Sequence, residues 1–407
     1  MRASHRISDF KSSITLQLNA EAQELKAQGH NVINLTAGQL PFSPDELFIE
    51  KLKSFCDETS SFHYCPVSGD KALIKQVLEW SSSQRSVDLS NHGALISSGG
   101  KHSLSTLFCG LINPGDEVIL LAPYWISYAP QIELYGGVCR IVESDFDHQL
   151  TPSIEAIKSQ ITSKTKAIVV NSPSNPSGIV YSEVWMQSFS KLVKDNPHLT
   201  VISDEIYREL SYQGNAPVYF YQYDSSLLDQ TIIISGISKI LASTGLRIGW
   251  TIAPKQFIAS LTKLQGQLAS GPNTLVQKAL VDYGLENITE FLTPIKSHLL
   301  SNLETIKDVF TTYGIGDRFY QTEGAFYFLI NFSGLPVHQA YQQSLDDEAD
   351  YSADISRQLL SEAGVAVVPS GDFGLKNAAR ISLVSHPAEF REAIEKIAKL
   401  ITAKKIC

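Results

Sequence analysis

Cysteine is scarce in this chain of 407 residues, and its placement argues against the usual cysteine-based frameworks. No C-x-x-C pair occurs, the number of cysteines is odd, and four of them lie in apolar or mixed segments. A disulfide framework or a zinc site is therefore not expected, and the sequence predicts no metal centre. We expect reduced, buried thiols at Cys56, Cys65, Cys109, Cys139 and Cys407.

Long apolar runs and blocks of basic residues are also missing. The longest apolar runs, such as 118–122, are far too short to span a membrane, and residues 1–10 lack the apolar segment of a signal peptide. The chain has 33 Lys and Arg against 42 Asp and Glu, a net charge of −9. Without clustered cations it is a poor binder of nucleic acid or anionic membranes, although small anionic ligands remain possible. We expect a cytoplasmic protein.

Apolar residues make up 43% of the chain and charged residues 18%, which is enough to build a large buried core. From Ala94 onward, short β-type runs alternate with longer amphipathic stretches. This alternation predicts an α/β fold with a mainly parallel, doubly wound sheet that is covered on both faces. The expected strands are 94–97, 117–121, 139–142, 167–170, 200–203, 231–235 and 247–252.

The pattern changes after about Asn287. A long helical stretch over 288–313 is followed by strand-like runs at 325–332, 365–368 and 380–383, with helices between and after them. This is typical of a smaller α+β domain, completed by the N-terminal arm. We therefore predict a large domain over 46–287 and a small domain formed by 1–45 plus 288–407.

Polar residues follow the expected strands with unusual consistency, and in such sheets ligands bind at the carboxyl ends of the strands. Ser98-Gly99-Gly100-Lys101 opens a helix after the first strand. This turn could bind an anion at a helix N-terminus or could simply be a tight turn, because it fits neither the Walker pattern nor G-x-G-x-x-G. The other strand-end residues are Asn175, Asp204, Tyr207, Lys239 and Arg247.

Lys239 decides how this set is interpreted. In a turn after a buried strand, a lysine is either solvated or a partly desolvated amine suited to Schiff-base chemistry. An amine and an anion site in one cleft suggest a phosphorylated aldehyde, and pyridoxal phosphate is the obvious one. That cofactor needs a carboxylate at its pyridine nitrogen and donors at its phenolic oxygen. Asp204, Tyr207 and Asn175 are of the right types, although Asp204 alone could equally be a helix N-cap.

At these residues the chain resembles the class I, fold-type I pyridoxal-phosphate aminotransferases, and most closely the pattern of bacterial aspartate aminotransferases. The resemblance runs from about Ser12 to the C-terminal helix. The most specific stretch is Ser235-x-x-Ser-Lys239-x4-Thr-Gly-x-Arg247-x-Gly249. Further matching motifs lie at 63–69, 114–118, 123–125, 175–178, 203–207, 324–327 and 380–382.

The resemblance implies a role for each matching residue. Lys239 would hold the cofactor and move the substrate proton, Asp204 would keep the pyridine nitrogen protonated, and Arg380 would bind the substrate α-carboxylate with its two-pronged guanidinium. Gly38, Trp125 and Asn175 would also contact substrate. The implied cofactor ligands are Tyr64 (from the partner subunit of a homodimer), Gly99, Gly100, Lys101, Trp125, Asn175, Asp204, Tyr207, Ser235, Lys239 and Arg247.

The implied function is transfer of an amino group between an L-amino acid and a 2-oxo acid such as 2-oxoglutarate. The family's G-E-P-D-F stretch reads Gly38-Gln39-Leu40-Pro41-Phe42 here, and no basic residue can be assigned to a distal carboxylate. Aspartate is thus the first candidate donor, while aromatic, aliphatic or basic amino acids remain open. A lyase or synthase on the same scaffold, such as a cysteine-conjugate β-lyase, is the alternative. A regulator module with a DNA-binding extension is disfavoured, because the resemblance begins by about residue 12.

Overall fold

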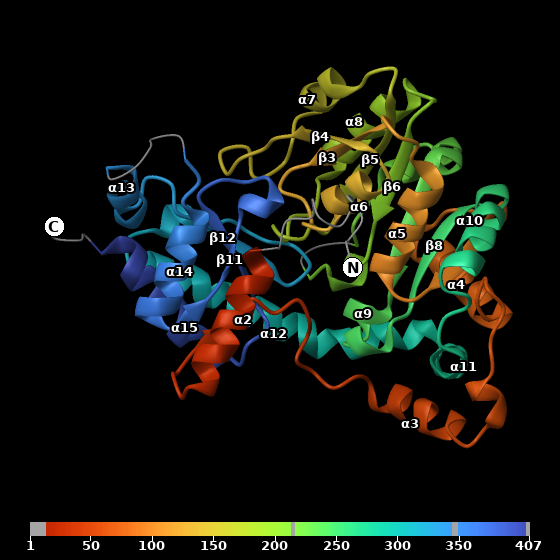
Figure 1. Cartoon of the computed structure of the whole chain (residues 1–407), viewed down its shortest axis with the longest axis horizontal. Helices are drawn as coiled ribbons and strands as arrows, with labels where there is room; N and C mark the ends of the chain where they lie inside the picture. The colour runs from red at the N-terminus through yellow and green to blue at the C-terminus, as the bar shows by residue number, and fades with distance from the viewer. Residues whose placement is uncertain (1–13, 213–215, 344–348, 404–407) are drawn as a thin grey trace, which may run out of the picture.

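The computed structural model describes residues 14–212, 216–343 and 349–403. Its centre is a seven-stranded sheet in the order β2-β8-β7-β6-β5-β3-β4 (Figure 1). The four neighbouring pairs among β7, β6, β5, β3 and β4 are parallel, whereas β8 runs antiparallel to both β7 and β2. The strands are β2 His92–Ser97, β3 Glu117–Leu121, β4 Val138–Val142, β5 Thr165–Asn171, β6 Thr200–Asp204, β7 Thr231–Gly236 and β8 Gly249–Pro254.

Apolar side chains on this sheet alternate between two hydrophobic clusters, one on each face. In β5, Ile168 and Val170 belong to one cluster, while Ala167 and Val169 belong to the other. Successive strand residues point to opposite faces, so a sheet covered on both faces needs apolar residues at every position. The predicted doubly wound α/β fold is confirmed. The surrounding helices are α3 Glu46–Phe55, α4 Lys71–Arg85, α5 Gly100–Leu111, α6 Tyr128–Leu134, α7 Ile154–Gln160, α8 Glu183–Lys194, α9 Ile237–Ile240, α10 Lys255–Leu268 and α11 Thr274–Tyr283.

The N-terminal arm and the C-terminal part come together beside this sheet. Strand β1 (Ile33–Asn34) pairs in parallel with β10 (Val365–Ala366), and β11 (Val368–Pro369), β12 (Ala378–Ser382) and β9 (Tyr327–Asn331) form an antiparallel sheet. In Figure 1 the red α2 lies next to the blue α14 and α15. This arrangement agrees with the expected α+β composition; the exact boundaries 1–45, 46–287 and 288–407 stay predictions. The helices here are α2 Ile14–Ala27, α12 Ile288–Thr312, α13 Pro336–Gln342, α14 Ser352–Ala363 and α15 Pro387–Thr402.

Three local expectations differ from the structure. The strand expected over 247–252 begins at Gly249, because Arg247 adopts a left-handed conformation with φ of 56°. Lys239 lies in the four-residue helix α9 rather than in a turn. The strand expected over 365–368 is divided into β10 and β11.

The cysteines were expected to be buried, and this is wrong for those that the structure describes. Cys56 is exposed, and Cys65, Cys109 and Cys139 are half-buried; all four are free thiols. Cys407 and the first ten residues lie outside the described residues.

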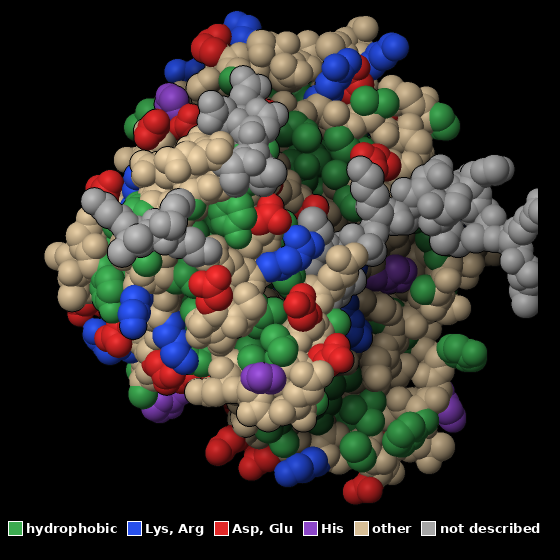
Figure 2. All heavy atoms as spheres, turned by 60° about the vertical axis from the view of Figure 1, so that its left-hand side comes forward, with side chains coloured by type: hydrophobic (Ala, Val, Ile, Leu, Met, Phe, Trp, Pro, Cys, Tyr) green, Lys and Arg blue, Asp and Glu red, His purple; other side chains and the backbone are tan. Residues whose placement is uncertain are grey.

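Charges of both signs are interspersed on the face that Figure 2 turns to the viewer, with no continuous basic field. Within the described ranges, no helix combines the length and the apolar character that crossing a membrane requires.

Candidate active site

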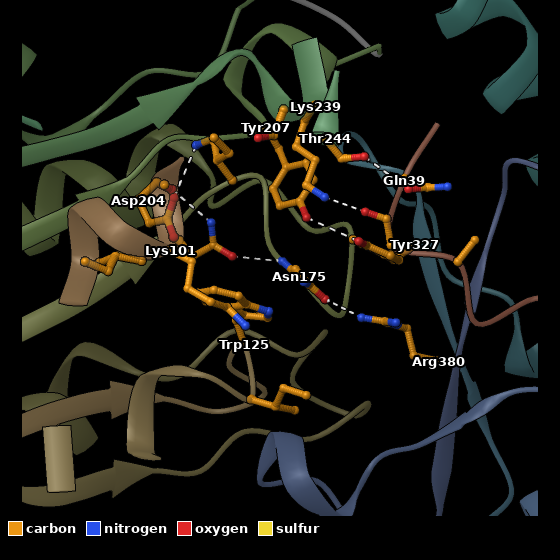
Figure 3. A pocket seen from close by; sticks show the side chains of 18 of the residues that line it. Gln39, Lys101, Trp125, Asn175, Asp204, Tyr207, Lys239, Thr244, Tyr327 and Arg380 are labelled. Carbon is orange, nitrogen blue, oxygen red and sulfur yellow. Dashed lines mark hydrogen bonds between the residues drawn. The ribbon is translucent and has the colours of Figure 1, made fainter. Parts of the chain in front are cut away.

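A cavity of about 660 Å³ lies at the carboxyl ends of the large sheet and receives side chains from the small sheet and the N-terminal arm. Figure 3 shows Lys239, Tyr207, Asn175 and Arg380 converging on it. Most of the residues predicted from the sequence line this cavity: Gly38, Gly100, Lys101, Trp125, Asn175, Asp204, Tyr207, Lys239, Arg247 and Arg380. Gly99 adjoins it at the start of α5, whereas Ser235 is buried in β7 opposite Trp250.

One end of the cavity is built to receive an anion. Gly99 caps the twelve-residue helix α5 with φ of +89°, and a Cβ at this position would lie 2.5 Å from Nη2 of Arg247. A Cβ on Gly249 would lie 2.4 Å from the backbone nitrogen of Gly100. Only glycine therefore permits this close approach of backbone and guanidinium. A helix N-terminus and an arginine together favour a bound phosphate.

Lys239 supplies an amine that is unusually easy to deprotonate. Its Nζ donates a hydrogen bond to the carbonyl oxygen of Gly38 and lies 5.7 Å from the centre of the Phe326 ring. Burial, followed by the positive charges of Arg380, Arg247 and Lys101, lowers its pKa to about 8. About half of the amine is therefore neutral at pH 8, a far larger share than in an ordinary lysine, and a nucleophilic lysine requires this neutral form.

Asp204 ends β6 as a buried carboxylate. The Tyr128 hydroxyl donates to its Oδ2 at 2.5 Å, and the Ile206 backbone N–H donates to its Oδ1 at 3.3 Å. Burial is the main cause that raises the pKa of Asp204 to about 6, and these hydrogen bonds oppose the rise. Among the described residues, no basic side chain forms a salt bridge with Asp204. Its carboxylate is thus suited to a cationic N–H group of a ligand.

Two hydrogen bonds and two aromatic rings hold the Arg380 side chain in place. Its Nη1 donates to Oδ1 of Asn175 at 3.0 Å, and its Nη2 donates to the carbonyl oxygen of Thr36 at 3.1 Å. The guanidinium carbon lies 4.5 Å from the centre of the Tyr327 ring and 5.4 Å from that of Phe373. Its buried Nε has no hydrogen-bond partner among the described residues. Nη1 and Nη2 each carry a second N–H group, and these groups can donate to a bound carboxylate.

Trp125 and Lys101 both line the cavity and lie against each other. Nζ of Lys101 lies 5.0 Å above the Trp125 ring, and the Trp125 ring meets the edge of Tyr128 at 5.4 Å. Burial and the charge of Arg247 lower the pKa of Lys101. The side chain of Lys101 therefore turns along the cavity wall, while its backbone belongs to the first turn of α5.

Two tyrosines at the site had no assigned role in the sequence. Tyr128 follows Trp125 by three residues, so both lie near the start of α6, and only its contact with Asp204 reveals its function. The Tyr327 hydroxyl lies 3.2 Å from that of Tyr207. Tyr327 is the last residue of the motif Gly324-Ala-Phe-Tyr327. This motif supported the family resemblance but did not indicate what Tyr327 itself does.

Tyr64 stands apart from the cavity of its own chain. It is 95% exposed and does not line the cavity. The segment that carries it is anchored to helix α11 by Gln277. This side chain donates to Cys65 Sγ at 3.3 Å and accepts from the Asp70 backbone N–H at 2.8 Å.

Known proteins share both the sequence and the fold. A family model described as "Aminotransferase class I and II" matches residues 30–397. The chain is 33% identical to an aspartate aminotransferase of Bacillus sp. (strain YM-2), with 98% of each chain covered. It is 32% identical to an aspartate aminotransferase of Bacillus subtilis (strain 168), covering 98% of this chain and 99% of that one. The structure of a single mutant of Thermus thermophilus aspartate aminotransferase superimposes with a TM-score of 0.87 at 29% identity, over 98% of this chain and 100% of that one.

Proposed function

The chain belongs to the family of class I and II aminotransferases and is an enzyme of the transaminase type, and from this premise we propose its cofactor, substrates and site residues. The cofactor is pyridoxal phosphate. The amino donor is L-aspartate, and the acceptor is a 2-oxo acid such as 2-oxoglutarate. The observation that carries the proposal is the convergence of a depressed-pKa lysine, a buried carboxylate and an anion site on one cavity.

The residues present fit this cofactor by their donor chemistry. Arg247 and the backbone N–H groups of Gly100 and Lys101 are available for a phosphate, whereas the Gly99 N–H donates to the Ser97 carbonyl oxygen at 2.7 Å. We propose that Gly99 serves the phosphate through the close approach that it allows, since a Cβ there would collide with Arg247. Asp204 offers a buried carboxylate without a salt bridge among the described residues, and Lys239 offers a readily neutralised amine. We propose that Tyr207 and Asn175 face the phenolic oxygen, that Trp125 covers the ring, and that Ser235 belongs to the same shell. When bound, pyridoxal phosphate supplies an aldehyde that binds amines and a ring that accepts electrons.

Lys239 moves the proton in the proposed reaction. Its pKa of about 8 leaves a far larger neutral fraction at neutral pH than an ordinary lysine has, so the amine can accept a proton from the substrate α-carbon and return it. The Gly38 carbonyl, which accepts from Nζ, restrains the amine within the cavity. Asp204 holds a proton on a ligand nitrogen, since a buried carboxylate with a raised pKa gains most from a cationic N–H partner.

Arg380 binds the α-carboxylate, which every amino-acid substrate carries. The contacts with Asn175 and Thr36 fix the guanidinium plane, and the second N–H groups of Nη1 and Nη2 remain as donors for the substrate. Bidentate pairing of guanidinium and carboxylate also orients the substrate.

The preference for aspartate follows from the count of cations. Of the described residues that line the cavity, four are cationic: Lys101, Lys239, Arg247 and Arg380. Lys239 is assigned to the chemistry, Arg247 to the phosphate and Arg380 to the α-carboxylate. Lys101 is the cation that remains. We propose that its backbone N–H serves the phosphate and that its ammonium binds the distal carboxylate of a dicarboxylic substrate.

The proposed assembly is a homodimer in which Tyr64 of each chain reaches the phosphate site of the other. The support is that Tyr64 is almost fully exposed, does not line its own cavity, and is carried by an anchored segment. Nearby Phe62 is also 69% exposed, so two large aromatic side chains lie on the surface of this segment. A cytoplasmic location stays a prediction.

The test is a panel of L-amino acids with 2-oxoglutarate or pyruvate as acceptor. We expect aspartate to be the best donor, and Lys101→Met to lower kcat/KM for acidic donors about tenfold or more while alanine is little affected. Arg380→Leu should impair all donors alike. A preference for aromatic or aliphatic donors that Lys101→Met leaves unchanged would overturn aspartate but not transamination. Ammonia release without an acceptor would indicate the alternative lyase function.

A further inference from the structure

We propose that Tyr327 is a positioning residue that serves two parts of the site, orienting the Tyr207 hydroxyl through its own hydroxyl and holding the Arg380 guanidinium with its ring. The inference rests on the proposed function, because Tyr207 and Arg380 gain their roles there. Tyr327 itself is assigned no contact with substrate or cofactor.

The register of the small sheet places Tyr327 beside Arg380. In the antiparallel pair of β9 and β12, Tyr327 lies opposite Ser382 and Leu329 lies opposite Arg380. Tyr327 and Arg380 are therefore diagonal neighbours on one face of the sheet, where aromatic and long side chains reach each other. The guanidinium carbon lies 4.5 Å from the ring centre, so the cation faces the ring. A planar support of this kind restricts a guanidinium that two hydrogen bonds and the more distant Phe373 ring also hold.

The hydroxyl of Tyr327 faces the opposite side of the site. It lies 3.2 Å from the hydroxyl of Tyr207, and both tyrosines are buried. The two rings meet edge to face with centroids 5.8 Å apart, which fixes the approach of the two oxygens.

Counting protons decides which hydroxyl is the donor in the working enzyme. Each phenol carries one proton. If Tyr207 donated to Tyr327, it would have no proton left for a cofactor oxygen; if Tyr327 donates, the Tyr207 proton is free to face the cavity. Burial raises the pKa of both hydroxyls; the charge of Arg380 opposes this rise as the second-largest influence at Tyr327 but only as the fourth at Tyr207, which favours Tyr327 as the donor. The donated bond also strengthens Tyr207 as a donor, because hydrogen bonds in a chain polarise one another.

A hydrogen bond donated to the cofactor's phenolic oxygen stabilises negative charge and lowers the pKa of the bound cofactor. The test is a pH titration of the visible absorbance of the enzyme loaded with pyridoxal phosphate. Tyr327→Phe should raise the titration midpoint by about half a pH unit or more. The matched control is Tyr212→Phe, which removes another contact between two hydroxyls, the partly buried one with Thr322 at 2.7 Å, away from the cavity lining. It should leave the midpoint unchanged.

The ring is tested separately by the binding of maleate, a dicarboxylate without an amino group. Tyr327→Phe keeps the ring and should bind maleate within about twofold of the wild type, whereas Tyr327→Leu should weaken it about tenfold. The melting temperature of each variant is measured as well. A general loss of structure would lower the melting temperature of a variant along with its maleate affinity. A wild-type midpoint in Tyr327→Phe, an equal shift in Tyr212→Phe, or unchanged maleate affinity in Tyr327→Leu would overturn the inference. A wild type that takes up pyridoxal phosphate without a visible, titratable band would contradict the proposed function instead.

Discussion

The Tyr128 hydroxyl donates a hydrogen bond of 2.5 Å to Oδ2 of Asp204 at the floor of the cavity. This contact and a longer one from the Ile206 N–H stabilise the ionised carboxylate, yet burial still raises the pKa of Asp204 to about 6. A charge that is only partly compensated costs stability in the cofactor-free protein. The buried carboxylate therefore lowers the stability of the cofactor-free protein, and a bound cationic group at Asp204 would compensate for this loss.

Asp204→Asn should accordingly stabilise the cofactor-free protein while abolishing transamination. The native pKa of about 6 lies above the ordinary 3.8, so the carboxyl stabilises the fold only below about pH 4, and this contribution is lost as the pH rises through 6. At pH 8 the variant should gain about 2–3 kcal/mol, estimated from a shift of about two pKa units. Urea unfolding at pH 8 and pH 4 checks this, and the gain should vanish at pH 4.

Asp224→Asn is the control, because the pKa of this carboxyl is shifted in the opposite direction to that of Asp204. Lys194 and Ser226 lower the pKa of this exposed carboxyl to about 2, so its replacement should not stabilise at pH 8. Equal gains in both variants would show that general charge reduction, and not the burial of Asp204, is responsible.

Arg380→Leu should lower kcat/KM about a hundredfold for every amino donor, as expected for the loss of a charge-assisted bidentate contact of about 3 kcal/mol. Lysine should restore only part, since it offers a point charge without the fork. Arg391→Leu, which removes an exposed arginine 3.5 Å from Asp308, should leave kcat/KM unchanged. A loss confined to acidic donors would instead mark Arg380 as the distal-carboxylate ligand.

Mixing two inactive variants tests the shared site. Tyr64→Ala and Lys239→Ala should each be nearly inactive alone. In a hybrid of the two chains, one site would combine Lys239 of one chain with Tyr64 of the other. Because random pairing makes half of the dimers hybrids, about one quarter of the wild-type activity should return after refolding the mixture. No recovery, or a monomeric mass in sedimentation at micromolar concentration with activity intact, would contradict the dimeric site.

A buried ion pair joins Arg85 to Glu205, the residue that directly follows Asp204 at the end of β6. Arg85 Nε and Nη2 each lie 2.7 Å from Oε2 of Glu205, and Ser203 and Tyr221 both donate to Oε1 at 2.7 Å. Arg85→Met should cost on the order of 3–5 kcal/mol of unfolding free energy, because it leaves a buried carboxylate unpaired. Lys396→Met removes an exposed i,i+4 pair with Glu392 and should cost about 0.5 kcal/mol or less. Equal costs would show that the buried pair has no special weight.

The sequence predicted the fold because its strands are apolar at nearly every position, as the two clusters in β5 require. It also predicted that Asn175, Asp204 and Lys239 gather at the cavity, since each ends or follows a parallel strand of the large sheet and the carboxyl ends of these strands meet at one edge. Arg380 lies inside β12 of the small sheet and Arg247 lies before β8, so strand ends do not account for these two arginines, and the role of Arg380 came from the family resemblance.

What escaped prediction depends on how two segments pack. Tyr128 meets Asp204 across 76 residues, and Tyr327 meets Tyr207 across 120, so no local pattern signals either contact. The start of β8 was misplaced because Arg247 takes a left-handed conformation that few arginines adopt. Here Gly99 and Gly249 crowd the guanidinium and the neighbouring backbone, a tertiary constraint invisible in the sequence.

A single half-reaction tests whether the enzyme transaminates L-aspartate through Lys239. Enzyme loaded with pyridoxal phosphate is mixed with L-aspartate without any 2-oxo acid, and cofactor and products are quantified. We expect one equivalent of oxaloacetate per site, with the cofactor retained as pyridoxamine phosphate, and no such conversion in Lys239→Ala. Continued turnover with release of ammonia, or an undiminished half-reaction in Lys239→Ala, would contradict the proposed function.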